Sequence, residues 1–305
     1  MIWEDYKAEI QTIDLSKFTD QPIELAILRE DLNDPEISGN KFRKLKYNFL
    51  EAKKLNLFQI LTFGGAFSNH IAATAAAGKK YGFKTIGIIR GEELKDKINE
   101  NPTLRFAQNC GMELHFISRE DYRNKENPSF LTELNNKFPN TYVVPEGGTN
   151  DFAIKGCKEI LHEACFEYDF ITTSIGTGGT IAGLIESSKS HQKVLGFPSL
   201  KGDFFQNDIE KLTSKDNFTI YNEYHFGGYG KVNEELINFV NYFKKTTQIQ
   251  LDPIYTGKMV FGVLQLIKNH IFNDYSKILM IHTGGLQGIE GMNNRLKLKN
   301  KTIIE

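Results

Sequence analysis

Two lysines at the start of a predicted helix are the first residues that could do chemistry. Lys41 and Lys44 lie one helical turn apart in "SGNKFRKL" (38–45), directly after a Ser-Gly-Asn turn. A turn followed by a helix N-terminus suits anion binding, and a deprotonated lysine amine can attack a carbonyl group. The alternative is an ordinary helix with a solvated basic face. Residues elsewhere in the chain must decide between these two interpretations.

A glycine-rich loop supplies a second candidate site. The stretch "ITTSIGTGGTIAGLIESS" (171–188) predicts a strand, a tight turn and a helix. Backbone amides in this turn could point at a phosphate, and the helix dipole would add to the attraction. Ile181 takes the place of the third glycine of GxGxxG, and no Walker A motif occurs, so the loop fits one phosphate monoester better than a dinucleotide or triphosphate. The amides belong to Gly176, Thr177, Gly178, Gly179 and Thr180.

Glycine clusters end four of the predicted strands, at 64–65, 146–148, 176–179 and 283–285. In open α/β sheets ligands bind outside the carboxyl ends of the strands, where glycine allows the backbone to come close to them. Each cluster by itself is explained as a tight strand-to-helix turn. The four together favour a shared cleft.

The elements that must position these residues alternate between short apolar runs and helical patterns. Such alternation predicts an α/β fold of open, twisted, mainly parallel sheets flanked by helices. The length of 305 residues allows two compact domains or one large unit. Strands are predicted at 58–65, 84–91, 112–118, 141–148, 170–176, 193–199 and 277–285, and helices at 68–82, 101–111, 231–246 and 256–272.

Composition narrows the function classes. The net charge of −1 gives no field to hold a polyanion, which argues against nucleic acid as a partner. No apolar run approaches the roughly 20 residues that span a bilayer, and the acidic start "MIWEDYKAEI" is not typical of a signal peptide. Cys110, Cys157 and Cys165 form no CxxC pair and indicate reduced core cysteines in the cytoplasm. "HEACF" lacks the second histidine of HExxH, so no metal site is predicted.

A lysine after a Gly-Asn turn, a loop for one phosphate and several glycine-ended strands together suggest pyridoxal 5'-phosphate (PLP). The chain resembles the 1-aminocyclopropane-1-carboxylate deaminase / D-cysteine desulfhydrase family, which has the tryptophan-synthase-β-like fold (fold type II of PLP enzymes). The resemblance spans residues 38–285, and "GNKxRKL" and "DPxYTGK" are its specific parts. It rests on the motifs "SGNKFRKL", "GGAFSNH", "PEGGTN", "GTGGT", "GGYGKVNEE", "LDPIYTGKM" and "IHTGG".

The resemblance implies roles for the residues of the cofactor site. Lys41 would hold PLP as a Schiff base, and burial beside other cations would lower its pKa. Lys44 would contact the cofactor phosphate. Asn69 would face O3′ of the ring, and Ser68 would lie near the substrate carboxylate and the reacting carbon. A plain helix N-cap is the alternative for Ser68, and both roles can hold together.

The resemblance also implies a substrate side. Tyr229 and Tyr255 match two tyrosines that surround the substrate, and each could transfer a proton or stack on the cofactor. Buried tyrosines with satisfied hydroxyls are the alternative. His70, Thr283 and Gly284 are further candidates for substrate binding.

Two threonines favour a desulfhydrase over a ring-opening deaminase. Thr256 stands where ring-opening members carry a glutamate beside the pyridine nitrogen, and Thr283 stands where they tend to carry a leucine. A carboxylate there favours a protonated ring and a stronger electron sink, which a neutral hydroxyl does not supply. We therefore expect β-elimination on D-cysteine to give pyruvate, sulfide and ammonia. Phe67, Lys231 and Val232 depart from the family pattern, and all three are expected near the substrate side.

We expect two domains with PLP in the cleft between them. The large domain comprises residues 1–43 and 150–305, and the small domain comprises residues 44–149. The family also implies a homodimer. Other small amino acids remain open as substrates, among them D-serine, β-substituted alanines and the cyclopropane substrate. A protein of another class, one that binds a phosphorylated metabolite without catalysis, also remains open.

Overall fold

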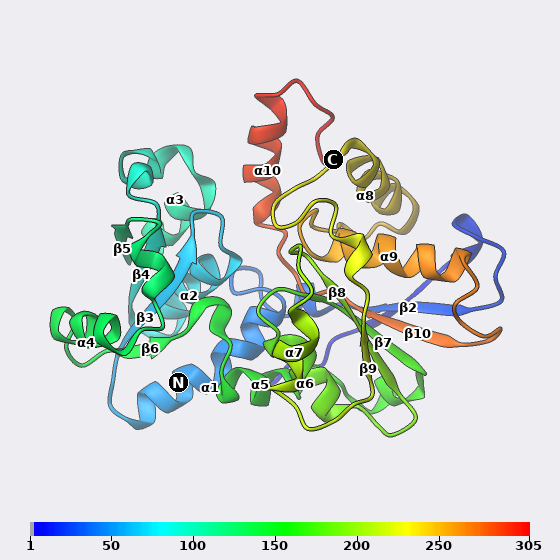
Figure 1. Cartoon of the computed structure of the whole chain (residues 1–305), viewed down its shortest axis with the longest axis horizontal. Coiled ribbons are helices and arrows are strands. Elements are labelled where there is room, and N and C mark those ends of the chain that lie inside the picture. The colour runs from blue at the N-terminus through cyan, green and yellow to red at the C-terminus, as the bar shows by residue number, and fades with distance from the viewer. Residues whose placement is uncertain (1–2) are drawn as a thin grey trace.

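Two sheets form the framework of the computed structural model, which describes residues 3–305 (Figure 1). The larger sheet has the strand order β1-β2-β10-β7-β8-β9 and the smaller one the order β5-β4-β3-β6. Within both sheets, β1 and β2 are the antiparallel pair, and the other neighbours run parallel. The strands are β1 Ile10–Ile13, β2 Glu24–Leu28, β3 Gln59–Gly65, β4 Lys84–Arg90, β5 Met112–Ile117, β6 Tyr142–Val144, β7 Phe170–Ile175, β8 Lys193–Pro198, β9 Phe218–Ile220 and β10 Lys277–Ile281.

Helices connect the parallel strands and cover both sheets. They are α1 Asn40–Lys54, α2 Asn69–Tyr81, α3 Pro102–Asn109, α4 Pro128–Lys137, α5 Asp151–Cys157, α6 Gly179–Ser187, α7 Phe205–Glu210, α8 Glu234–Thr247, α9 Thr256–Lys268 and α10 Gly288–Lys297. No helix in residues 3–305 is long and apolar enough to cross a lipid bilayer.

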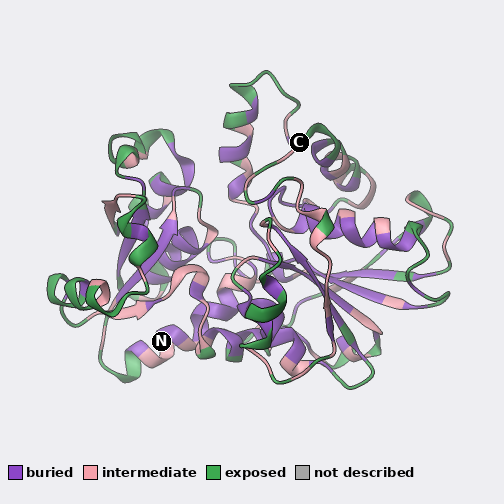
Figure 2. Cartoon of the chain, in the orientation of Figure 1, coloured by how far each residue is buried: buried purple, intermediate pink, exposed green. Residues whose placement is uncertain are grey.

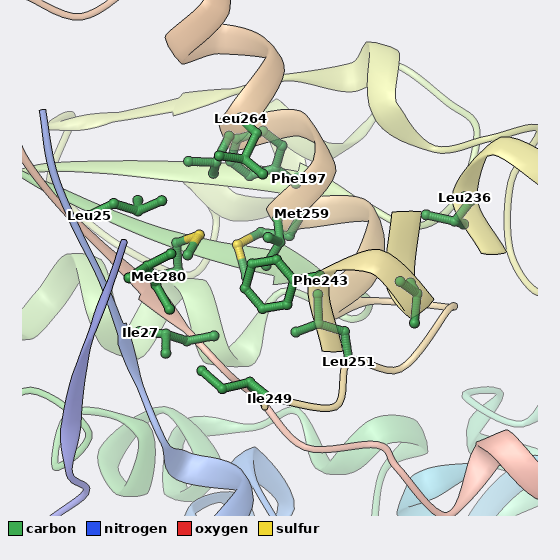
Figure 3. Packing of buried hydrophobic residues seen from close by; sticks show 14 of the residues in the cluster. Leu25, Ile27, Phe197, Leu236, Phe243, Ile249, Leu251, Met259, Leu264 and Met280 are labelled. Carbon is green, nitrogen blue, oxygen red and sulfur yellow. The ribbon is translucent and has the colours of Figure 1, made fainter. Parts of the chain in front are cut away.

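The central strands of the larger sheet are buried on both faces, as Figure 2 shows. Ile27 and Met280 point to one face, where α8 and α9 pack, and Figure 3 shows Met259 and Phe243 meeting these strands there. The neighbouring residue Leu28 points to the other face and joins side chains of α5, α6 and α7. This alternation follows from the two-residue period of a strand and explains why these strands are continuously apolar.

The smaller sheet has its own two layers. On one face, Phe42 and Phe49 of α1 pack with the alanine-rich helix α2. On the other face pack Leu134 of α4 and Phe138, which directly follows α4. Trp3 stacks on the Tyr81 ring at 4.3 Å in the first of these clusters. Helix α1 thus contributes Phe42 and Phe49 to this cluster, and it also packs against α5. The division of the chain into the two predicted domains stays a prediction.

The predicted strands and helices are confirmed, with shifted ends where local chemistry intervenes. Strand β6 stops at Val144 because Pro145 has no N–H to donate to a ladder. Helix α8 begins only at residue 234, where the side chain of Asn233 caps it. Strands β1, β2 and β9 were not predicted. The cysteines are free and buried, as the pattern indicated.

Candidate cofactor and substrate site

One pocket of about 480 Å³ lies at the carboxyl ends of the strands of both sheets. All four glycine clusters contribute to its wall, for example through Gly65, Gly147, Gly176 and Gly284. Its size is typical of a site for a small molecule. The structure thus brings together turns that lie more than 200 residues apart in the sequence.

The turn before α1 places Lys41 at this wall. Gly39 has a positive φ of 64°, and a Cβ atom there would lie 2.1 Å from the carbonyl oxygen of Thr283. The backbone amide of Asn40 donates to that same oxygen at 3.1 Å, so the two loops are held together. The Lys41 Nζ donates to the Asn40 side-chain oxygen at 3.0 Å. Burial, and then the charge of Lys44, lower the pKa of Lys41 to about 7, so much of this amine is unprotonated near neutral pH.

Lys44 lies one turn along α1 and joins the ends of the two sheets. Its Nζ donates to the carbonyl oxygen of Gly147 at 3.0 Å and to the Thr149 hydroxyl at 2.9 Å. It also donates to the hydroxyl of Thr177 at 3.3 Å, within the glycine turn. Burial lowers the pKa of Lys44 to about 8.

The glycine turn leads directly into α6. Gly178 precedes the helix with a φ of 83°, and a Cβ atom on Gly179 would come within 3.2 Å of the Lys44 Nζ. The first amides of a helix have no intrahelical partners, so those of Gly179 and Thr180 are available to an anion. The turn and the Lys44 ammonium thus offer hydrogen-bond donors and positive charge at one place.

Ser68, Asn69 and His70 line the pocket at the start of α2. The Ser68 hydroxyl accepts from the amide of Ile71 at 3.3 Å, which makes this serine the predicted N-cap. The pocket also receives the N-terminus of α2, whose free amides suit a carboxylate.

His70 is a buried, neutral acceptor in this wall. Its Nε2 lies 2.7 Å from the Thr62 hydroxyl, which itself donates to the carbonyl of Val144 at 2.8 Å. The His70 Nε2 must therefore donate, and Nδ1 is left as an acceptor without a partner in residues 3–305. Burial, then Lys41 and Lys44, hold the pKa of His70 well below its usual value.

Tyr229 and Tyr255 both line the pocket, and their rings meet edge to face. Their ring centroids are 6.0 Å apart at an angle of 63°. Burial, and then Tyr229, raise the pKa of Tyr255 well above its usual value, so this phenol stays protonated. Tyr229 is 43% exposed, at the outer side. Its loop is held by the buried Lys258, whose Nζ donates to the carbonyl oxygens of His225 and Gly228 at 2.9 Å each.

Thr283 and Thr256, the two threonines that bear on the choice of substrate, lie in different places. Thr283 lines the pocket, 3.3 Å from the hydroxyl of Ser174, which the sequence reasoning did not single out. Thr256 is fully buried and is not among the lining residues. Its hydroxyl donates to the Asp252 carboxylate at 2.7 Å and accepts from the Asp252 amide at 3.0 Å. The structure therefore brings Thr283, but not Thr256, to the wall.

Two charged residues of the pocket were also missed. Arg90 ends β4 and Glu146 follows β6, so both occupy strand ends like the glycine clusters. Their position after a buried strand was the available signal.

Comparison with known proteins decides the family. A family model described as pyridoxal-phosphate dependent enzyme matches residues 9–284. The chain belongs to this family. Its sheets and pocket are those of a PLP-dependent enzyme of fold type II, which confirms the expected fold class and cofactor.

Similar proteins carry the names that the motifs suggested. A bifunctional D-cysteine desulfhydrase/1-aminocyclopropane-1-carboxylate deaminase, mitochondrial, from Arabidopsis thaliana is 32% identical over 296 residues, covering 87% of this chain and 73% of that protein. A D-cysteine desulfhydrase from Klebsiella pneumoniae is 28% identical, covering 86% of this chain and 87% of that protein. The crystal structure of an ACC deaminase homologue aligns with a TM-score of 0.83 at 27% identity, covering 96% of this chain and 94% of that one. These similarities confirm the family resemblance.

The pocket of this PLP-dependent enzyme fits the cofactor chemically. Lys41 presents an amine whose pKa of about 7 suits reaction with an aldehyde. The glycine turn and Lys44 would hold the phosphate. When bound, PLP supplies an electron sink for bonds broken at the α-carbon.

Proposed function

We propose that this protein is a PLP-dependent lyase that catalyses β-elimination on a small amino acid. D-cysteine is the proposed substrate, and pyruvate, sulfide and ammonia are the products. The Lys41 amine is the single observation that carries this proposal, because it lines the pocket with a pKa of about 7 and can hold the cofactor or accept the α-proton. The α-carboxylate would lie at the N-terminus of α2, beside Ser68 and Asn69.

The neutral side chains near Thr283 favour β-elimination over ring opening. Thr283 and Ser174 offer hydroxyl groups at the pocket wall, and Glu146 is the acidic residue that lines it in the described chain. That carboxylate accepts from the Tyr122 hydroxyl at 2.8 Å and lies 3.4 Å from the Lys125 ammonium. The Glu146 carboxylate is thus already paired with the segment between β5 and α4. Loss of a good β leaving group needs a weaker electron sink than opening a cyclopropane ring.

Deamination of 1-aminocyclopropane-1-carboxylate is the second candidate. The name of the Arabidopsis thaliana relative, which is 32% identical to this chain, includes both activities. The protonated Tyr255 could serve as an acid in either case.

The test is a panel of D- and L-amino acids assayed for pyruvate and 2-oxobutyrate, with sulfide measured in parallel. We expect pyruvate and sulfide in equal amounts from D-cysteine. Release of 2-oxobutyrate from the cyclopropane substrate would instead favour the second candidate. Lys41→Ala should lose the visible absorbance of the bound cofactor. If the wild-type protein shows no such absorbance band after addition of PLP, the proposal that it is a PLP-dependent lyase is refuted.

A further inference from the structure

Arg90 is a cation of the pocket that the proposed function has not used. It ends β4 and pairs in register with Gly65 of β3, three residues before Ser68. Because Gly65 has no side chain, the guanidinium folds across it, and Nη2 lies 3.5 Å from the place where a Cβ atom on Gly65 would be. The side chain is thereby directed over the strand end that leads into α2, next to the place where the substrate carboxylate would bind.

The neighbours of Arg90 hold it without neutralising it. Its guanidinium lies 5.6 Å from the ring centroid of Tyr122, in a cation–π contact. The Tyr122 hydroxyl donates to Glu146, and that carboxylate also faces Lys125. No hydrogen bond or ion pair joins Arg90 to a carboxylate in the part of the chain that the structure describes. The guanidinium is therefore oriented and keeps its donors for a ligand.

The cofactor phosphate and the substrate carboxylate, the two other anions expected in the pocket, would have partners of their own. The cofactor phosphate would occupy the glycine turn beside Lys44, and the substrate carboxylate would occupy the N-terminus of α2. Arg90 lies on β4, the strand next to β3, and its guanidinium covers Gly65 beside the N-terminus of α2, in the wall that also includes Tyr229. What remains for it is negative charge on the side chain of the substrate.

We propose that Arg90 binds the negative charge that the β-substituent carries as it leaves, an inference that rests on the proposed function. In the elimination, the α-proton passes to a base, its bonding electrons form the Cα–Cβ double bond, and the bond from Cβ to sulfur breaks. Both electrons of that bond stay on sulfur, which departs as HS⁻. A guanidinium beside the sulfur meets little charge before the reaction and a full charge afterwards, so it accelerates the step.

The first test compares leaving groups in Arg90→Gln and Arg90→Lys. With D-cysteine, Arg90→Gln should lower kcat roughly 10- to 100-fold, with a much smaller change in KM. Chloride is a far weaker base than HS⁻ and needs less stabilisation, so the loss with 3-chloro-D-alanine should be several-fold smaller. Arg90→Lys should recover part of the rate. Equal losses for both substrates would overturn the proposal, because Arg90 would then act on a shared step.

The second test measures binding and does not depend on turnover. D-aspartate and D-asparagine have the same shape and differ in the charge of the β-substituent, and their dissociation constants follow from changes in the absorbance of the bound cofactor. Arg90→Gln should reduce the preference for D-aspartate over D-asparagine by about 10-fold. An unchanged ratio would overturn the proposal.

A matched control and the wild-type protein separate the proposed role of Arg90 from the proposed function of the protein. Arg123→Gln removes an exposed guanidinium of the same half of the molecule, outside the pocket, and should change neither readout. If wild-type protein turns over none of the β-substituted alanines, the proposed function fails. The aspartate-to-asparagine ratio then still decides whether Arg90 binds anions.

Discussion

The hydroxyl of Thr256 donates a hydrogen bond of 2.7 Å to the carboxylate of Asp252 and accepts one of 3.0 Å from the Asp252 amide. Both groups are fully buried, and the same carboxylate also accepts from the amides of Ile254 and Tyr255 at 2.8 Å. Thr256 therefore stabilises the turn that carries Tyr255 into the pocket.

Replacing Thr256 by valine keeps the shape of the side chain and removes both of these hydrogen bonds. We expect Thr256→Val to lower the free energy of unfolding by about 1–3 kcal/mol, because buried polar groups of Asp252 lose partners. Thr256→Ser keeps the hydroxyl and should lose less. Urea unfolding monitored by circular dichroism measures both, and equal stability of the valine variant and the wild type would contradict this prediction.

The low pKa of Lys41 predicts how the cofactor-free protein captures an aldehyde. A pKa of about 7 means that the reactive, unprotonated amine becomes populated as the pH rises through 7, well below the range of an exposed lysine. The rate of reaction with pyridoxal, which lacks the phosphate, should therefore rise with a midpoint near pH 7.

Lys44→Met tests the cause of that shift. Removing the neighbouring positive charge should raise the pKa of Lys41 and move the midpoint to higher pH, although burial still accounts for most of the lowering. Pyridoxal is the right probe because Lys44 is also the expected phosphate ligand. A midpoint near pH 10 in the wild type would show that the amine is not buried in solution.

Lys258 should control the mobility of the loop that carries Tyr229. Lys258→Met removes the donor to His225 and Gly228, so amide hydrogen exchange in residues 225–230 should accelerate by roughly 10-fold or more. Activity should fall while the absorbance of bound PLP stays. Lys268→Met, at the exposed end of the same helix, is the control and should exchange like the wild type.

The close approach at Gly39 predicts a substitution that damages the site without removing a functional group. Gly39→Ala would place a methyl group 2.1 Å from the carbonyl oxygen of Thr283, in a residue with positive φ. We expect a loss of about 2–4 kcal/mol in stability together with weaker PLP binding, since Lys41 lies two residues on.

Gly82→Ala separates the backbone strain of a positive φ from the steric contact of an added methyl group. Gly82 also has a positive φ, of 75°, but nothing lies within 4 Å of an added Cβ atom. It should cost about 1 kcal/mol and leave PLP binding intact. Thermal unfolding and PLP titration of the two variants give the comparison, and equal effects would mean that the Thr283 contact is unimportant.

Much of the framework could be predicted because its signals are local. Apolar runs ended by glycine define β3, β4 and β7, and Ser68 and Gly82 delimit α2. Strand β1 has only Ile13 buried, so its sequence carries a weak pattern. The exchange of hydrogen bonds between Asp252 and Thr256, and the path of Arg90 over Gly65, depend on how the chain turns and packs in three dimensions. Pattern and spacing do not contain that information.

Lys44 fastens the segment after β6 to the turn after β7, through Thr149 and Thr177. These hydrogen bonds hold the two segments together at the end of the pocket where the cofactor phosphate would bind. An amino acid that enters and leaves beside Ser68 would not disturb them, so turnover would not release the cofactor.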